Sequence, residues 1–138
     1  MRVLGIDLGL KRIGVATGES GHRATSARPT ISASGTLKRD AEAIDAVAKR
    51  EEAQALIVGV PLGDAGEAEK MAKAALKLAE TLTAMGWTVH TVNEAMTSVE
   101  AEANLRRDGG NASARRKLRD GEAARLIVER FFDEQDRA

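Results

Sequence analysis

Val3-Leu4-Gly5-Ile6-Asp7-Leu8-Gly9 is an apolar run that ends in one carboxylate and a glycine. A run of this kind is typical of a strand that is buried on both faces of a sheet. Asp7 stands where the strand ends. Because open α/β sheets hold their ligands beyond the carboxyl ends of the strands, Asp7 is a candidate site residue. The alternative is that its carboxylate only hydrogen-bonds the turn that follows.

Two more strands are expected soon after the first. They are predicted over residues 13–17 and 31–37, although Gly35 weakens the second. The short spacing of the three strands favours an antiparallel meander. A helix is then expected to begin at Asp40.

The second half of the chain alternates strands with helices. Strands are predicted over residues 55–60, closed by Pro61, and over residues 87–92. Between them, a helix that ends at Gly86 is predicted by a stripe of apolar residues at helical spacing. The stripe consists of Met71, Ala74, Ala75, Leu78, Leu82 and Met85.

Two helices are expected at the end of the chain. Thr97 and Glu100 have the spacing of a capping box that opens the first, and the second runs from Ser113 or Leu118 to Phe132. The order of elements predicts an α/β fold with a five-stranded mixed sheet, its later strands parallel and its helices on both faces. We expect residues 1–138 to form a single domain.

The composition limits the class of protein. The chain has no cysteine, which excludes disulfides and thiolate metal sites. Asp7 interrupts the first apolar run, so no signal peptide is predicted, and no apolar segment approaches the roughly 20 residues that cross a bilayer. A soluble cytoplasmic protein without a membrane partner is expected.

The charges balance, with 21 basic and 21 acidic side chains, but they are unevenly distributed. Between residues 106 and 119 one acid, Asp108, accompanies six basic residues: Arg106, Arg107, Arg115, Arg116, Lys117 and Arg119. With its glycines, this stretch is predicted to be a mobile basic loop that grips a nucleic-acid backbone; the alternative is a solvated connection. With only three aromatic residues no base-stacking platform is expected, so phosphates and shape would carry recognition.

Two more acids are expected to join Asp7. Glu94 follows its strand as Asp7 follows the first, so parallel strands would bring both to one edge of the sheet. Asp120 continues the apolar stripe of the last helix one turn back from Ala123 and Ala124, on the inward face. For Asp120 alone, an N-cap or a salt bridge is the simpler interpretation.

Three converging carboxylates would repel one another unless cations lie between them. Oxygen ligands suit Mg²⁺ or Mn²⁺, and two such ions fit attack of water on a phosphodiester, one ion activating the water and the other stabilising the leaving oxygen. No histidine is then needed. His90 is interpreted as a structural mid-strand residue and His22 as an exposed loop residue.

Four blocks of this sequence resemble the YqgF/RuvX family of Holliday-junction-resolvase-like proteins with an RNase H-like fold. The blocks are residues 5–16, residues 58–66 with Val58-Gly59-Val60-Pro61-Leu62, residues 94–101 around Glu94, and residues 117–124 around Asp120. The resemblance implies that Asp7, Glu94 and Asp120 are catalytic metal ligands. It also implies an endonuclease that processes the 5′ end of pre-16S rRNA in ribosome biogenesis or, alternatively, resolves Holliday junctions in recombination.

The third block departs from the family pattern. The family commonly has Asp-Glu-Arg where this chain has Asn93-Glu94-Ala95. Loss of that acid and that arginine would weaken a contact behind the metal ligands or a contact to phosphate.

Lys11 and Arg12 are expected to contact phosphate near the first turn.

Two rival functions remain at this point. The first turn also resembles the phosphate loop of actin-like ATPases and sugar kinases, but those proteins need two such subdomains and this chain has room for one. The second rival is a catalytically weak nucleic-acid-binding module, favoured by Asn93 and Ala95. A homodimer would favour a four-way junction as substrate, because symmetric resolution needs two active sites.

Overall fold

Five strands and three helices make up the described part of the chain. The computed structural model describes residues 1–62, 65–94 and 112–137, with the backbone alone for residues 112–120 and 137. The strands are β1 (Arg2–Leu8), β2 (Arg12–Glu19), β3 (Ala24–Ser32), β4 (Ala55–Val60) and β5 (Val89–Asn93). The helices are α1 (Leu37–Arg50), α2 (Gly66–Ala84) and α4 (Ala112–Arg137).

The strands form one mixed sheet in the order β3-β2-β1-β4-β5. β1 pairs antiparallel with β2, and β2 pairs antiparallel with β3, which confirms the predicted meander. β1, β4 and β5 are parallel. The predicted five-stranded mixed sheet is therefore confirmed, and the carboxyl ends of three neighbouring strands lie at one edge.

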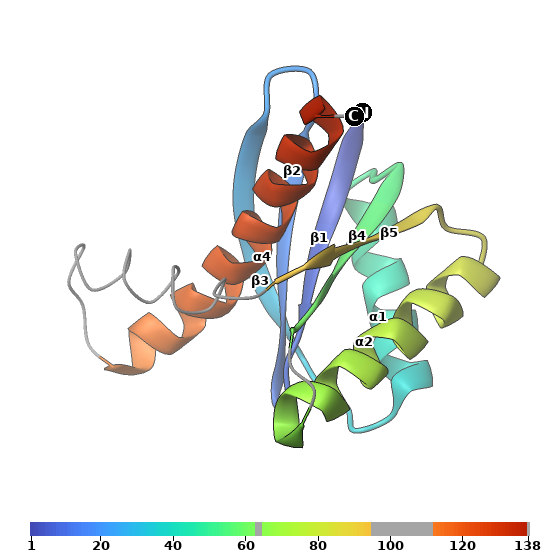
Figure 1. Ribbon diagram of the computed structural model, residues 1–138, viewed down its shortest axis with the longest axis vertical. Helices are drawn as coiled ribbons and strands as arrows, with labels where there is room; N and C mark the ends of the chain where they lie inside the picture. The colour runs from blue at the N-terminus through green and yellow to red at the C-terminus, as the bar shows by residue number, and fades with distance from the viewer. Residues whose placement is uncertain (63–64, 95–111, 138) are drawn as a thin grey trace.

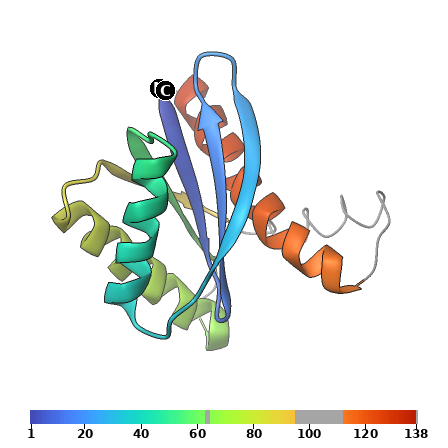
Figure 2. The ribbon, with the colours of Figure 1, turned by 180° about the vertical axis from the view of Figure 1, so that it is seen from behind.

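Helices cover both faces of the sheet, as the sequence predicted. α4 crosses one face diagonally, and α1 and α2 lie on the other (Figures 1 and 2). Alternation along β1 sends Leu4 and Ile6 toward α1 and α2, and Val3 toward α4. Asp7 shares the parity of Val3, so its side chain is directed to the face that α4 covers.

Gly5 lets α4 approach β1 closely. A Cβ atom at this position would lie 2.4 Å from Val128 Cγ2 and 2.9 Å from the main-chain oxygen of Ala124. Any side chain on Gly5 would thus push the helix away. The glycine in the first apolar run is what seats α4 on the sheet.

The third strand lies earlier in the chain than predicted. β3 covers residues 24–32, whereas residues 31–37 were expected. β3 is an edge strand with many exposed, polar residues, and it contains Pro29, which edge strands tolerate. The apolar residues that suggested a strand over residues 31–37 therefore belong to the end of β3 and to the connection between β3 and α1.

Two helix predictions were wrong in detail. α1 begins at Leu37, and Asp40 lies buried in its first turn, where Oδ1 accepts hydrogen bonds of 2.8 Å from both the amide and the hydroxyl of Ser34. Met85 caps the end of α2 and is 41% exposed, so it is not part of the core stripe. Gly86 ends the helix as predicted, with φ at +105°.

The last helix is longer than predicted. α4 begins at Ala112 and continues to Arg137, past the expected end at Phe132. The helix predicted after Thr97 lies outside the described residues. Among the helices described here, none combines the length and apolar character needed to cross a membrane.

Candidate active site

Two of the three predicted acids meet at the carboxyl edge of the sheet. Asp7 is the penultimate residue of β1, and Glu94 directly follows β5. The amide of Glu94 donates to the carbonyl of Val60 at 3.0 Å, which extends the β4–β5 pairing by one residue. The predicted convergence of Asp7 and Glu94 at one edge is confirmed.

Gly59 leaves the space that the Glu94 carboxyl group fills. A Cβ atom at Gly59 would lie 2.6 Å from Glu94 Oε2 and 2.4 Å from Ile127 Cδ1. The Glu94 side chain therefore folds back over β4, on the face that α4 covers. The sequence pattern placed Gly59 in a block near the site but gave no sign of this role.

The Glu94 carboxyl group is strongly perturbed. Burial raises its pKa to about 9, and the negative charge of Asp7 and a hydrogen bond to the Asp7 carboxyl group act in the same direction. The positive charge of Arg130 lowers that pKa. Because a carboxyl–carboxyl hydrogen bond requires a proton, the pair shares one at neutral pH when no cation is bound.

One oxygen of this pair is suited to a cation. Glu94 Oε2 is buried and has no hydrogen-bond partner among the described residues. A buried oxygen without a donor is costly, and a hard cation such as Mg²⁺ or Mn²⁺ would satisfy it. Asp7 and Glu94 therefore fit a divalent ion, although the described side chains include no group of three acids or histidines that could hold one.

The third predicted acid is located only by its backbone. Asp120 lies on α4 one turn before Ala124, whose carbonyl oxygen approaches Gly5. Four helical residues span about 6 Å, so the backbone of Asp120 lies about that far along α4 from this contact. Over this turn α4 also crosses the sheet sideways, because the backbone at Gly121 packs on Ala27 of β3. The Asp120 side chain lies outside the described residues, so its role stays a prediction.

The basic residues are divided between two elements. Lys11 is exposed in the turn after β1, and Arg12 opens β2 half-buried. The prediction of a loop up to residue 119 was wrong, because α4 already begins at Ala112. Its first turns contain Arg115, Arg116, Lys117 and Arg119. The loop prediction relied on the glycines at 109 and 110. The residues from Ala112 to Asp120 include no glycine or proline, so their helix propensity is sufficient for α4 to begin at Ala112.

Arg130 is a residue of this region that the sequence pattern did not reveal. Its Nη1 donates a hydrogen bond of 2.6 Å to the main-chain oxygen of Asn93, 37 residues earlier. This contact joins α4 to the end of β5, next to Glu94. His90, by contrast, has the structural role that was expected: its ring packs on Phe131 with centroids 5.0 Å apart.

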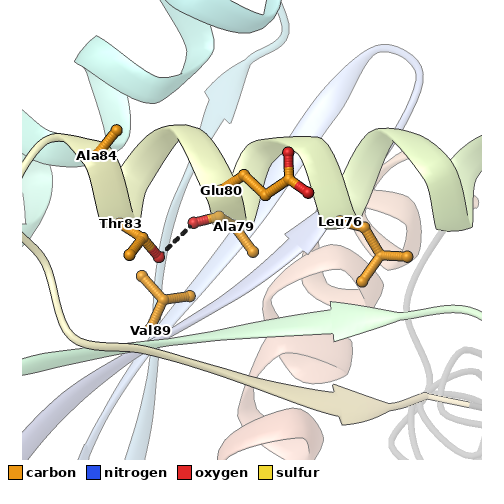
Figure 3. A pocket seen from close by; sticks show the side chains of 6 residues that line it. All are labelled: Leu76, Ala79, Glu80, Thr83, Ala84 and Val89. Atoms are coloured by element: carbon orange, nitrogen blue, oxygen red, sulfur yellow. Dashed lines mark hydrogen bonds between the residues drawn. The ribbon is translucent and has the colours of Figure 1, made fainter.

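Two of the cavities that described residues line are on the other face of the sheet. One of about 510 Å³ opens between α2 and β5 and is lined by Leu76, Ala79, Glu80, Thr83, Ala84 and Val89 (Figure 3). In it, the Thr83 hydroxyl donates to the carbonyl of Ala79, so this polar group is used within the helix. A second of about 280 Å³ lies beside the turn after β1 and includes Asp40, already bonded to Ser34. Neither contains the acidic pair.

The fold resembles that of a solved RuvC structure. RuvC from T. thermophilus, in complex with a Holliday junction substrate, superimposes with a TM-score of 0.61 and 17% sequence identity, covering 98% of this chain and 96% of that one. At this identity the likeness concerns the fold alone. It confirms the predicted α/β, RNase H-like fold.

Sequence comparison identifies relatives over nearly the whole chain. Two proteins named "Putative pre-16S rRNA nuclease" are similar: one from Dechloromonas aromatica is 38% identical over 95% of this chain and 90% of its own length, and one from Anaeromyxobacter dehalogenans is 37% identical over 96% and 97%. Residues 1–134 match the family described as "RuvX: Holliday junction resolvase". The chain therefore belongs to the RuvX family.

Proposed function

We propose that this protein is a metal-dependent endonuclease that hydrolyses phosphodiester bonds, with the 5′ end of pre-16S rRNA as its substrate in the cytoplasm. The observation that carries the proposal is the pairing of the Asp7 and Glu94 carboxyl groups. One oxygen of Glu94, Oε2, is buried and has no hydrogen-bond partner in the described part of the chain. Family membership and the names of the relatives support the choice of a nuclease and of this RNA.

Asp7, Glu94 and Asp120 would hold Mg²⁺ or Mn²⁺, with two ions as the expected number. When bound, these ions would supply an activated water and charge stabilisation at the phosphate. The chain's own part is to hold the carboxylates in place. The space at Gly59 and the hydrogen bond to Val60 do so for Glu94, and the rigid strand β1 does so for Asp7.

The basic residues would bind the substrate backbone. Lys11 follows Asp7 by four residues in an exposed turn, so its ammonium group and the Arg12 guanidinium are suited to phosphates next to the site. Arg115, Arg116, Lys117 and Arg119 would contact phosphates farther along the strand from the first turns of α4.

Two alternatives have their own support. The family description and the RuvC fold favour a Holliday junction as substrate, and a homodimer would then supply two active sites. Asn93 and Ala95 favour a binding module with weak catalysis, because the family's usual acid and arginine are absent there.

Cleavage of two substrates discriminates among these functions. A labelled pre-16S RNA and a four-way DNA junction are incubated with Mn²⁺ and either the wild-type protein or the Asp7→Asn variant. We expect wild-type cleavage of the RNA and at least a hundredfold loss in the variant. Preferential cleavage of the junction would favour the resolvase, and equal residual cleavage by both proteins would favour the binding module.

A further inference from the structure

The peptide group between Asn93 and Glu94 is held at both of its polar ends. Its carbonyl accepts the hydrogen bond of 2.6 Å from Arg130 Nη1 on α4. Its N–H donates to the carbonyl of Val60 at 3.0 Å on β4. Because a peptide group is planar and rigid, these two bonds fix its orientation. The Cα atom of Glu94, from which the side chain extends, is part of that plane.

The Arg130 guanidinium also acts on the Glu94 carboxyl group directly. Its positive charge lowers the pKa of Glu94, against the larger opposing effects of burial and Asp7. The same side chain thus holds the main chain before Glu94 and lies close enough for its charge to act on the carboxyl group.

α4 does not depend on Arg130 for its place on the sheet. The helix is anchored by buried apolar side chains, among them Ile127, Val128 and Phe131, which pack against β1, β2 and β4. A bond to one carbonyl at the sheet edge adds little to that packing. The hydrogen bond from Arg130 to the carbonyl of Asn93 acts mainly on the next residue, Glu94.

We propose that Arg130 is a positioning residue of the acidic site, which orients the Glu94 carboxylate toward Asp7 by fixing the peptide group from which Glu94 extends. The inference rests on the proposed function, because it concerns how that site holds its cation. It assigns a role to an arginine outside the four blocks that resemble the family.

Mn²⁺ titration by calorimetry tests this role with no substrate present. The variants are Arg130→Gln and Arg130→Lys, and the matched control is Arg125→Gln. Arg125 lies on the same helix but bonds Glu122, Glu129 and Thr25, away from the site. Loss of a group that orients a metal ligand costs about 10- to 100-fold in affinity, so we expect at least tenfold weaker binding for Arg130→Gln. Arg130→Lys keeps the charge and a donor but lacks the planar fork, and we expect about threefold weaker binding.

The unfolding temperature without metal separates positioning from stability. We expect Arg130→Gln to lower it by no more than Arg125→Gln does, while only Arg130→Gln weakens Mn²⁺ binding. Wild-type affinity in both Arg130 variants would overturn the inference, and so would tighter binding, which would mean that the guanidinium acts only as a repelling charge. If Arg130→Gln does not fold, the affinity of Arg130→Lys decides.

Asp7→Asn in the same titration keeps the two proposals apart. If it binds Mn²⁺ as the wild type does, or if neither binds, the proposed metal-dependent function fails. If Asp7→Asn loses binding and the Arg130 variants keep it, only the role of Arg130 fails.

Discussion

Glu94 Oε2 occupies the position that a side chain on Gly59 would need, 2.6 Å from where a Cβ atom would lie. This relationship explains why a glycine stands in the middle of β4, where a β-branched residue would otherwise be favoured. The gap lets the carboxyl group of one strand reach across its neighbour toward Asp7. The acidic pair therefore depends on three strands: β1 carries Asp7, β5 leads to Glu94, and β4 leaves space for the Glu94 carboxyl group at Gly59.

Gly59→Ala is expected to damage the site and the core together. The added methyl group would displace both Glu94 Oε2 and Ile127 Cδ1, and overpacking of this kind costs about 1–3 kcal/mol. Denaturant unfolding measures the loss of stability, and Mn²⁺ titration measures the displacement of Glu94. Gly21→Ala is the matched control, because nothing lies within 4 Å of a Cβ atom there. Equal results for the two variants would show that Glu94 adjusts without cost.

The strands and the acidic pair could be predicted because their signals are local. β1 and β4 are short apolar runs, and the acids at the ends of the parallel strands β1 and β5 must reach the same edge. β3 could not be placed, because a polar edge strand with Pro29 has no such signal. The contact between Arg130 and Asn93 could not be predicted either. It joins two polar residues across 37 positions, and its geometry exists only once α4 has packed on the sheet.

The stability of the metal-free protein is expected to fall as the pH rises. The pKa of Glu94 is about 9 in the folded protein and 4.5 as the reference for the unfolded chain, so the folded state binds the extra proton between these values. The contribution is complete below about pH 4.5 and is lost progressively up to about pH 9. Thermal unfolding in a chelator from pH 5 to pH 9 measures it. Glu94→Gln should remove much of this slope, whereas Glu42→Gln, at an exposed position on α1, should not. A slope unchanged in Glu94→Gln would place its origin elsewhere.

Mn²⁺ is expected to raise the unfolding temperature, and more so at higher pH. The ion binds the folded state only, so the stabilisation follows its concentration relative to the dissociation constant. At 100 times that constant it amounts to about 2.7 kcal/mol. Binding must displace the proton on Glu94, which is why affinity increases with pH. Scanning calorimetry with millimolar Mn²⁺ at pH 6.5 and pH 8 checks both points. An unchanged curve at both pH values would contradict the clustering of acids that the ion is expected to relieve.

Replacing Arg115, Arg116 and Lys117 together with alanine is expected to weaken nucleic-acid binding by a similar factor for all sequences. Phosphate contacts carry no sequence information, and each contributes about 0.7–0.9 to the slope of log affinity against log salt. The slope should therefore fall by about 2 if all three contact the backbone. Binding of several RNA oligonucleotides over a range of salt concentrations measures it. The control replaces Lys70, Lys73 and Lys77, which are exposed on α2 across the sheet from α4. Because it removes the same charge from the opposite face, an equal effect in both variants would mean that net charge, and not the start of α4, attracts the RNA.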